Sequence, residues 1–349
     1  MDPVTLCECL SPQELRVKDR IDGKVDRFRK THERSFRMLE RFDGKKPVID
    51  IERALYFTQS MKETEGQPLV LRWAKALRKI AENITVTVED DMLLLGRAGS
   101  RGGRYGILYP ELDGDFLDIA VKDLPTRTTS PASIDPEDAS RVVEEIAPYW
   151  KGKTFHEALN AALPEDVHKL TYDDPKGLVS RYIVNETASF RSSIQWVHDY
   201  AKILKRGFNG IKKEAQEKLA ALDPLSAKDT CEKKPFLDAV VIVCDAIVLW
   251  AKRYAQAARE KAAVTTDPQR KAELLRMAQN AEHVPGEPAR DFWEACQSQW
   301  FTQMFSRLEQ KTGTTISNGR MDQYFYPYYK ADVEAGKLDD SKAMELLEC

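Results

Sequence analysis

Apolar residues recur every three to four positions over most of the chain, which is the periodicity of amphipathic helices. One segment, residues 236–263, is apolar on most of its surface, so we expect a helix that is largely buried. Helices therefore dominate the predicted architecture. They cover residues 14–42, 51–62, 69–83, 135–147, 177–205, 236–263, 267–281, 287–309, 321–336 and 339–348.

Two regions depart from this helical pattern. Residues 84–88 alternate β-branched side chains and predict a strand, and residues 92–95 suggest a second one. The glycine-rich segment that follows carries Arg97, Arg101 and Arg104, which are suited to binding an anion. It does not match G-x-G-x-x-G, and no G-K-[ST] follows it. We therefore interpret this segment as a surface loop with solvated arginines.

Composition narrows the class of protein. The chain has 349 residues, with 53 basic and 56 acidic side chains and a net charge of -3. This balance gives no electrostatic footprint for nucleic acid. No uncharged apolar run reaches the length of a membrane span, and the N-terminus lacks the features of a signal peptide. We expect a cytoplasmic protein with neither nucleic acid nor membrane as a partner.

Metal and hydrolase chemistry are not indicated. The histidines His156, His168 and His198 are isolated in sequence, and neither H-E-x-x-H nor a nucleophile-elbow motif occurs. We interpret these histidines as structural and assign no metal ligand. The six cysteines are scattered and lack metal-ligand spacing, so we predict neither a zinc site nor a disulfide framework from them. They are Cys7, Cys9, Cys231, Cys244, Cys296 and Cys349.

One pair of polar residues has the spacing of a binding site. Arg191 and Gln195 are four residues apart within the predicted helix 177–205, so they would share a helical face at the margin of its apolar stripe. A guanidinium fork beside an amide suits an oxygen-rich tetrahedral anion. From spacing alone, an ordinary surface pair with Arg191 bridged to Glu186 or Asp199 is the simpler explanation, and both interpretations remain open.

Several segments together resemble the N-terminal region of the glycyl radical enzymes. The matches follow the order of that family over nearly the whole chain, which makes them specific jointly although none is specific alone. The resemblance implies a pyruvate formate-lyase-like α/β barrel of ten strands, of which this chain supplies a mainly helical N-terminal part, with no separate second domain. The matching segments are residues 51–54, 62–68, 72–77, 89–96, 110–111, 291–294, 299–301, 319–324 and 327–329, with Asp332 and Gly336.

Within the family, the chain is most similar to lyases that cleave the carbon–sulfur bond of isethionate (2-hydroxyethanesulfonate) into acetaldehyde and sulfite. Arg191 and Gln195 match the positions that bind the sulfonate group in those lyases. The resemblance also implies an anaerobic enzyme, a homodimer, and a partner activase. That activase uses S-adenosylmethionine and an iron–sulfur cluster to install a glycyl radical, which then generates a cysteine thiyl radical.

The chain departs from the family in length and in two motifs. The Gly-Cys motif of the thiyl cysteine and the terminal Gly-Tyr motif of the radical glycine are both absent from it. We therefore expect a truncated chain that has no catalytic residue, binds no cofactor or metal and is inactive alone. Other glycyl radical activities remain open, including diol, hydroxyproline and choline types, although an arginine would suit the cation of choline poorly. A helical scaffold protein and a bacterial microcompartment location also remain open.

Overall fold

The computed structural model describes residues 33–41, 45–101, 103–112, 117, 124–126, 128, 131–172, 197–310 and 316–349. Within these residues the structure is mainly helical, as predicted. Its elements are α3 (Glu33–Glu40), β1 (Val48–Asp50), α4 (Glu52–Glu63), α5 (Leu69–Asn83), β2 (Tyr105–Ile107), α7 (Pro136–Arg141), η1 (Val142–Ile146), α8 (Ala147–Trp150), α9 (Phe155–Ala162), α10 (Glu165–Tyr172), α12 (Tyr200–Ala220), η3 (Asp229–Lys233), α13 (Lys234–Val264), α14 (Pro268–His283), α15 (Phe292–Glu309), α16 (Met321–Glu334) and α17 (Asp340–Glu348).

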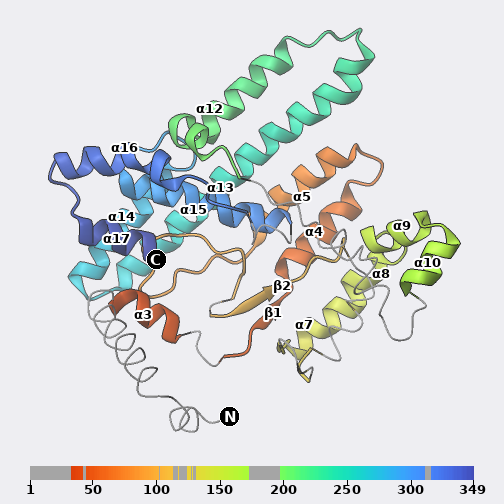
Figure 1. Ribbon diagram of the computed structural model, residues 1–349, viewed down its shortest axis with the longest axis horizontal. Coiled ribbons are helices and arrows are strands. Elements are labelled where there is room, and N and C mark those ends of the chain that lie inside the picture. The colour runs from red at the N-terminus through yellow and green to blue at the C-terminus, as the bar shows by residue number, and fades with distance from the viewer. Residues whose placement is uncertain are drawn as a thin grey trace, which may run out of the picture.

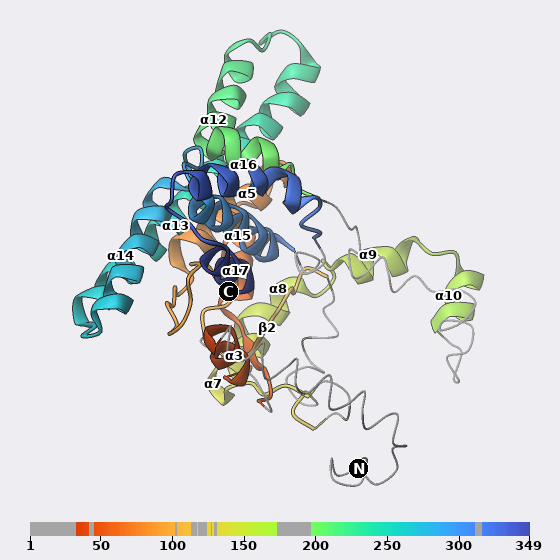
Figure 2. The same ribbon diagram turned by 60° about the vertical axis from the view of Figure 1, so that its left-hand side comes forward.

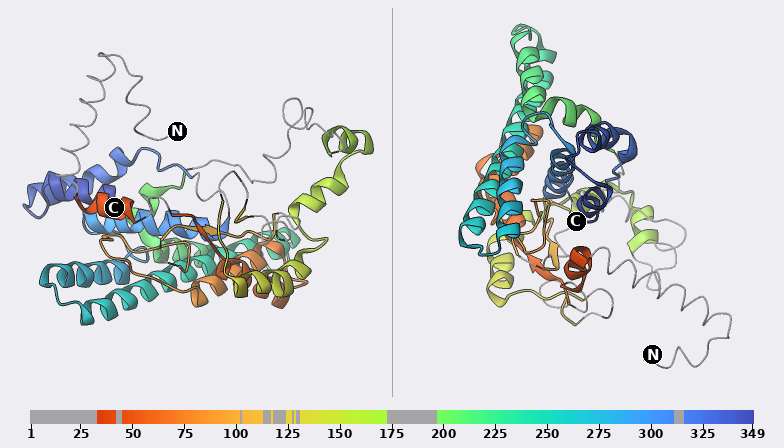
Figure 3. Two further views of the ribbon diagram at one scale, coloured as in Figure 1. Left: turned by 90° about the horizontal axis from the view of Figure 1, so that it is seen from below. Right: turned by 90° about the vertical axis from the view of Figure 1, so that its left-hand side faces the viewer.

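The long helix α13 organises the body of the molecule. It packs against α5, α12 and α14, while α15 lies against α16, α12 and α17 (Figure 1). The far halves of α12 and α13 project together beyond the body as a helical hairpin, which is also visible in Figures 2 and 3. Helices α9 and α10 extend from a different edge of the molecule (Figure 2).

The main core forms where α13 meets α5, α14 and α15. Trp250 and Tyr254 of α13 are fully buried, and the Trp250 ring centroid lies 5.6 Å from that of Phe301 in α15. Edge-to-face packing of such rings adds to the stabilisation from burying their apolar surface. The predicted helix at residues 236–263 is thus confirmed, but it is buried mainly in its C-terminal half, because its N-terminal half belongs to the projecting hairpin.

The strands do not lie where the sequence pattern predicts them. The described strands β1 and β2 pair in parallel, with Val48 opposite Tyr105. The predicted strands at residues 84–88 and 92–95 are wrong, because side chains take the place of a neighbouring strand. The Thr85 amide donates to the Glu52 carboxylate at 2.7 Å, and the Leu95 amide donates to Gln297 Oε1 at 2.7 Å.

The predicted helix at residues 177–205 is corrected at its C-terminal end. Residues 177–196 lie outside the described part of the chain, and residues 197–199 are not helical. Val197 forms a parallel bridge with Ser317, and helix α12 begins only at Tyr200. The Asp199 side chain sets this start by accepting a hydrogen bond from the Lys202 amide at 3.0 Å.

Other helical predictions agree closely with the structure. The predicted helix at 69–83 is α5, and the predictions at 267–281, 321–336 and 339–348 fall on α14, α16 and α17. In α14 and α17 the side chains of Asp267 and Asp339 cap the first turn, so periodicity and capping point to the same start. Among the residues that the structure describes, no helix combines the length and the apolar character needed to cross a bilayer.

Candidate functional site

Helix α15 is buried on most sides although it carries many polar side chains. Asp291 caps its N-terminus by accepting from the Glu294 amide at 2.9 Å. The fully buried Glu294 carboxylate in turn accepts from the Arg290 amide at 2.8 Å and is paired with the Arg290 guanidinium. Burying a polar group without a hydrogen-bond partner costs free energy, so most buried polar groups are paired. The polar residues of α15 therefore show which segments the helix holds in place.

One face of α15 holds the segment 93–96, which is not a strand. Trp293 Nε1 donates to the Leu93 carbonyl at 2.9 Å, and Trp300 Nε1 donates to the Gly96 carbonyl at 2.8 Å. Between them, the Gln297 amide group both accepts from the Leu95 amide and donates to the Leu95 carbonyl, at 2.7 Å each. Three side chains of one helix thus satisfy backbone groups that a neighbouring strand would otherwise satisfy.

A second face, about 120° around the helix from the first, holds the segment 197–200. Ser306 Oγ lies 2.7 Å from His198 Nε2, and the Tyr200 hydroxyl donates to Gln303 Oε1 at 2.6 Å. Gln303 Nε2 then donates to the Ile316 carbonyl at 3.0 Å. We call these contacts, together with the Val197–Ser317 bridge, the 197–200 anchor.

The two residues predicted to bind substrate, Arg191 and Gln195, lie outside the described residues. The 197–200 anchor is the nearest described structure on their C-terminal side, because Gln195 precedes Val197 by two positions. Asp199, one of the carboxylates that spacing offered as a partner for Arg191, caps helix α12 in the structure. The prediction for Arg191 and Gln195 therefore stays a prediction.

A buried ion pair, missed by the sequence reasoning, closes the other end of α15. Arg53 is 1% exposed and contacts both oxygens of Glu111, at 2.7 and 2.8 Å. It also donates to the carbonyls of Leu308 and Glu309 at 2.9 Å each, which are orphan acceptors at the end of the helix. Both Arg53 and Glu111 fall in segments that resemble the family, but nothing in their spacing predicts that they meet.

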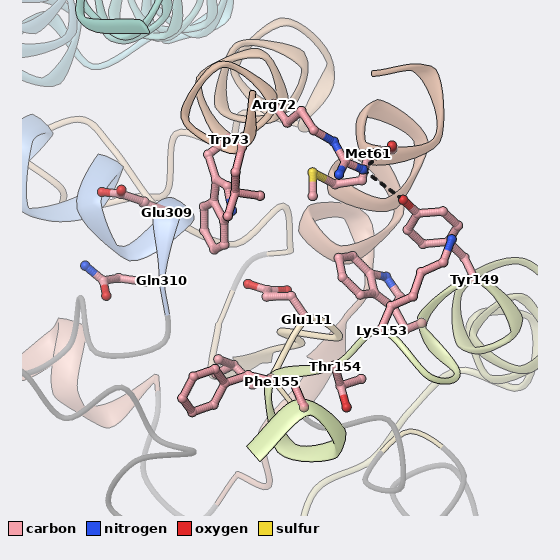
Figure 4. A pocket seen from close by; sticks show the side chains of 14 residues that line it. Met61, Arg72, Trp73, Glu111, Tyr149, Lys153, Thr154, Phe155, Glu309 and Gln310 are labelled. Atoms are coloured by element: carbon pink, nitrogen blue, oxygen red, sulfur yellow. Dashed lines mark hydrogen bonds between the residues drawn. The ribbon is translucent and has the colours of Figure 1, made fainter. Parts of the chain in front are cut away.

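A cavity of about 650 Å³ opens beside this ion pair (Figure 4). Three of its four charged side chains, Glu111, Arg72 and Lys153, already have partners. Glu111 binds Arg53, Arg72 donates to the Tyr149 hydroxyl at 3.1 Å, and Lys153 pairs with Glu65 at 3.0 Å. Its lining, largely apolar, holds no histidine or cysteine. The lining residues are Met61, Leu69, Arg72, Trp73, Glu111, Leu112, Tyr149, Trp150, Lys153, Thr154, Phe155, Ala158, Glu309 and Gln310.

The glycine-rich segment is not the loop of solvated arginines that we expected. Arg97 is 8% exposed, pairs with the Glu89 carboxylate and lies over the Tyr105 ring. Arg101 pairs with Asp135 at 2.7 Å. These carboxylates neutralise the two guanidiniums that an anion would need, which also disfavours an anion site here. Arg104 is exposed, as expected.

The buried thiols are held in their unreactive form. Burial raises the pKa of Cys244 to about 12 and raises the pKa of Cys296 as well, so both remain thiols at neutral pH. Among the described residues, no group of three or more histidine, cysteine or acidic side chains is placed to hold a metal ion.

Comparison with known proteins places this architecture in a family. Residues 26–349 match the model of the Pyruvate formate lyase-like family, so the chain belongs to that family. It is 81% identical over 346 residues to an isethionate sulfite-lyase from Desulfovibrio desulfuricans. That match covers 99% of this chain and 42% of the relative, so the chain spans about two fifths of the length of that protein.

Solved structures agree with the family assignment. A structure from Roseburia inulinivorans concerned with 1,2-propanediol dehydration matches with a TM-score of 0.80 and 31% identity, over 92% of this chain and 36% of that one. A glycyl radical enzyme from Archaeoglobus fulgidus matches with a TM-score of 0.78 and 32% identity, over 90% of this chain and 39% of that one. The chain thus has the fold of the corresponding part of these enzymes, and the family resemblance is confirmed.

Proposed function

We propose that this chain is the N-terminal part of a glycyl radical carbon–sulfur lyase that converts isethionate to acetaldehyde and sulfite. The observation that carries the proposal is the 81% identity to an isethionate sulfite-lyase over nearly the whole chain. Identity to the matching glycyl radical enzyme from Archaeoglobus fulgidus is 32%, so the similarity extends well beyond what the shared fold requires. We assign the whole chain to a single glycyl radical enzyme domain.

Arg191 and Gln195 are our candidates for holding the sulfonate. Arginine presents a planar fork of donors to an oxyanion, and the glutamine amide adds a further donor. When the carbon–sulfur bond breaks, negative charge collects on the departing sulfite. Donors already aimed at those oxygens would stabilise that charge without reorganising. The same pair would also fix the orientation of the hydroxyl-bearing carbon.

The radical chemistry belongs to the rest of the enzyme. A glycyl radical and a cysteine outside this chain would supply hydrogen abstraction from the hydroxyl-bearing carbon. We propose that a separate activating enzyme, dependent on S-adenosylmethionine and an iron–sulfur cluster, installs the radical. We also propose that the complete lyase is a homodimer located in the cytoplasm or in a bacterial microcompartment.

The test uses a holoenzyme in which this chain replaces the matching 346 residues of the Desulfovibrio desulfuricans isethionate sulfite-lyase. The enzyme is activated anaerobically, and sulfite and acetaldehyde are measured. We expect wild-type turnover, and a loss of about 100-fold or more in kcat/KM for Arg191→Ala, because a charge-assisted, two-pronged contact is removed. Arg191→Lys keeps the charge without the fork and should recover only part of this loss.

The matched control is Arg78→Ala. Arg78 lies on the surface of α5, where it pairs with Glu82 of the same helix, so its removal should leave turnover unchanged. Normal turnover by Arg191→Ala would remove the sulfonate assignment. Release of a dehydration product from a diol, with no sulfite from isethionate, would instead place the chain among the dehydratases of the family.

A further inference from the structure

Another cavity, of about 340 Å³, lies between the C-terminal part of α15 and the glycine-rich segment. We call it the Arg307 cavity. The described side chains that line it include three arginines, Arg97, Arg104 and Arg307, but a single carboxylate, that of Glu89. Arginine stays protonated at all ordinary pH values. The side chains of the Arg307 cavity therefore carry two more positive charges than negative ones.

Arg307 is the arginine of this cavity that lacks a counter-ion. It is partly buried, and among the residues that the structure describes no carboxylate pairs with it. Its Nε atom is buried and has no hydrogen-bond partner. Its guanidinium carbon lies 5.4 Å from the centre of the Tyr105 ring, which attracts the charge but accepts none of the N–H groups in the plane of the guanidinium. Because an unpaired charge away from water costs free energy, Arg307 is incomplete without an anionic acceptor.

Arg97 brings a second donor to the same place. Two of its nitrogens donate to the Glu89 carboxylate and to the Gly103 carbonyl, at 2.5 Å each, but its Nε atom is buried without a partner. Its guanidinium carbon lies 4.9 Å from the centre of the Tyr105 ring. The paired arginines of the glycine-rich segment do not form an anion site by themselves. Helix α15 changes this balance, because it adds the unpaired guanidinium of Arg307.

The ring that both guanidiniums contact is itself fixed. Tyr105 belongs to β2, where it lies opposite Val48 of β1. Its ring packs directly on the backbone of Gly99, because a Cβ added to Gly99 would lie 2.5 Å from two ring carbons. A binding site whose groups are already held in place loses less entropy when a ligand binds. The Arg307 cavity is therefore arranged in advance for an anion.

We propose that Arg307, with the Nε donor of Arg97 and the charge of Arg104, forms a binding site for an oxyanion. The guanidinium fork matches a group that presents two or more negatively charged oxygens, such as a carboxylate or a sulfate. This chemistry has two sources, a soluble anion or a carboxylate from the part of the enzyme beyond this chain, which spans 42% of the length of its Desulfovibrio desulfuricans relative. The proposal goes beyond the proposed function and does not depend on which substrate the enzyme cleaves.

The experiment uses the same holoenzyme without activation, so it needs no turnover. Sodium sulfate is titrated by calorimetry against a chloride buffer of equal ionic strength. For a soluble anion, wild type binds sulfate and Arg307→Gln weakens this binding by about 10-fold or more, because a charge-assisted contact is lost. Arg307→Lys keeps the charge and should lose less affinity. The matched control is Arg101→Gln, because Arg101 pairs with Asp135 and Asp138 and does not line the cavity, so sulfate affinity should not change.

Thermal unfolding of the same variants tests for a carboxylate supplied by the enzyme. In that case Arg307→Gln and Arg307→Met should lower the unfolding midpoint by about 2 °C or more, whereas Arg307→Lys should keep most of the wild-type value. Without any anion the sign reverses, because removing one of three mutually repelling charges relieves repulsion and should leave the midpoint unchanged or raise it. The proposal is overturned if Arg307→Gln neither weakens sulfate binding nor lowers the midpoint. Failure of the holoenzyme to release sulfite from isethionate would refute the proposed function and leave this result standing.

Discussion

The buried ion pair between Arg53 and Glu111 offers the sharpest test of how this fold is held together. Replacing Arg53 with methionine keeps an unbranched side chain of similar shape but removes the charge. The change leaves the Glu111 carboxylate, which is 7% exposed, without its cation. It also removes the donors that satisfy the last carbonyls of α15, those of Leu308 and Glu309.

The expected magnitude follows from these contacts. Removing one partner of a buried ion pair lowers the free energy of unfolding by about 3–5 kcal/mol, because an uncompensated charge remains in the interior. With a urea dependence of roughly 3 kcal/mol/M, the unfolding midpoint should fall by about 1–2 M. The measurement is urea unfolding of the chain followed by circular dichroism at 222 nm, with Arg78→Ala as the surface control.

The double variant Arg53→Met/Glu111→Leu separates the ion pair from simple packing. Because the stranded carboxylate is then also removed, the double variant should unfold at a higher urea concentration than Arg53→Met alone. The reasoning is refuted if Arg53→Met shifts the midpoint no further than Arg78→Ala. It is equally refuted if the two single shifts simply add in the double variant.

Three further outcomes follow from other contacts. Gly319→Ala should lower the urea midpoint of unfolding, because the added Cβ would be forced against Val197 at a backbone φ of +61°. Gly66→Ala is the control, since the φ of Gly66 is also positive but no atom lies within 4 Å of the added Cβ. An equal loss of stability in both variants would argue against the clash. Burial lowers the pKa of His198 in the folded protein, so as the pH falls the unfolded chain is protonated before the folded one. Stability should therefore fall as the pH drops below about 6.5. The difference between the urea midpoints at pH 7.5 and pH 5.5 should be smaller in His198→Gln than in the wild type. Cys231 is exposed, whereas burial raises the pKa of Cys244 to about 12. Iodoacetamide at pH 7.5 should therefore alkylate Cys231 at least about 10-fold faster than Cys244, as measured by peptide mass spectrometry. Equal rates of alkylation would contradict the buried position of Cys244.

Much of the helical framework could be predicted because its signals are local. In α5 the apolar spacing and the flanking Pro68 are enough to give the observed bounds. In α13 a continuous apolar surface already indicates a buried helix, and Trp250 and Tyr254 are fully buried in the structure. The family could likewise be inferred from short segments spread along the chain, and the comparisons confirm it.

The candidate site was predictable only in part. Arg191 and Gln195 came from resemblance, and they remain predictions because they lie outside the described residues. Spacing alone gave no reason to prefer a binding pair over a surface pair. Ser306 and Gln303, which contact His198 and Tyr200, carry no sequence signal beyond sharing a face of a helix. These contacts become visible only once α15 and the start of α12 are packed together.

The amino-acid sequence by itself determined the helical segments and the family, since both depend on patterns that neighbouring residues carry. Only the tertiary structure decided which backbone groups are satisfied by side chains from distant parts of the chain. Residues 92–95 have the composition of a strand, yet Gln297, some 200 positions away, takes the place of a strand partner. Arg53 and Glu111 are 58 residues apart in sequence, and they form an ion pair only in the folded chain. Such pairings depend on where whole helices pack, and no local pattern encodes that choice.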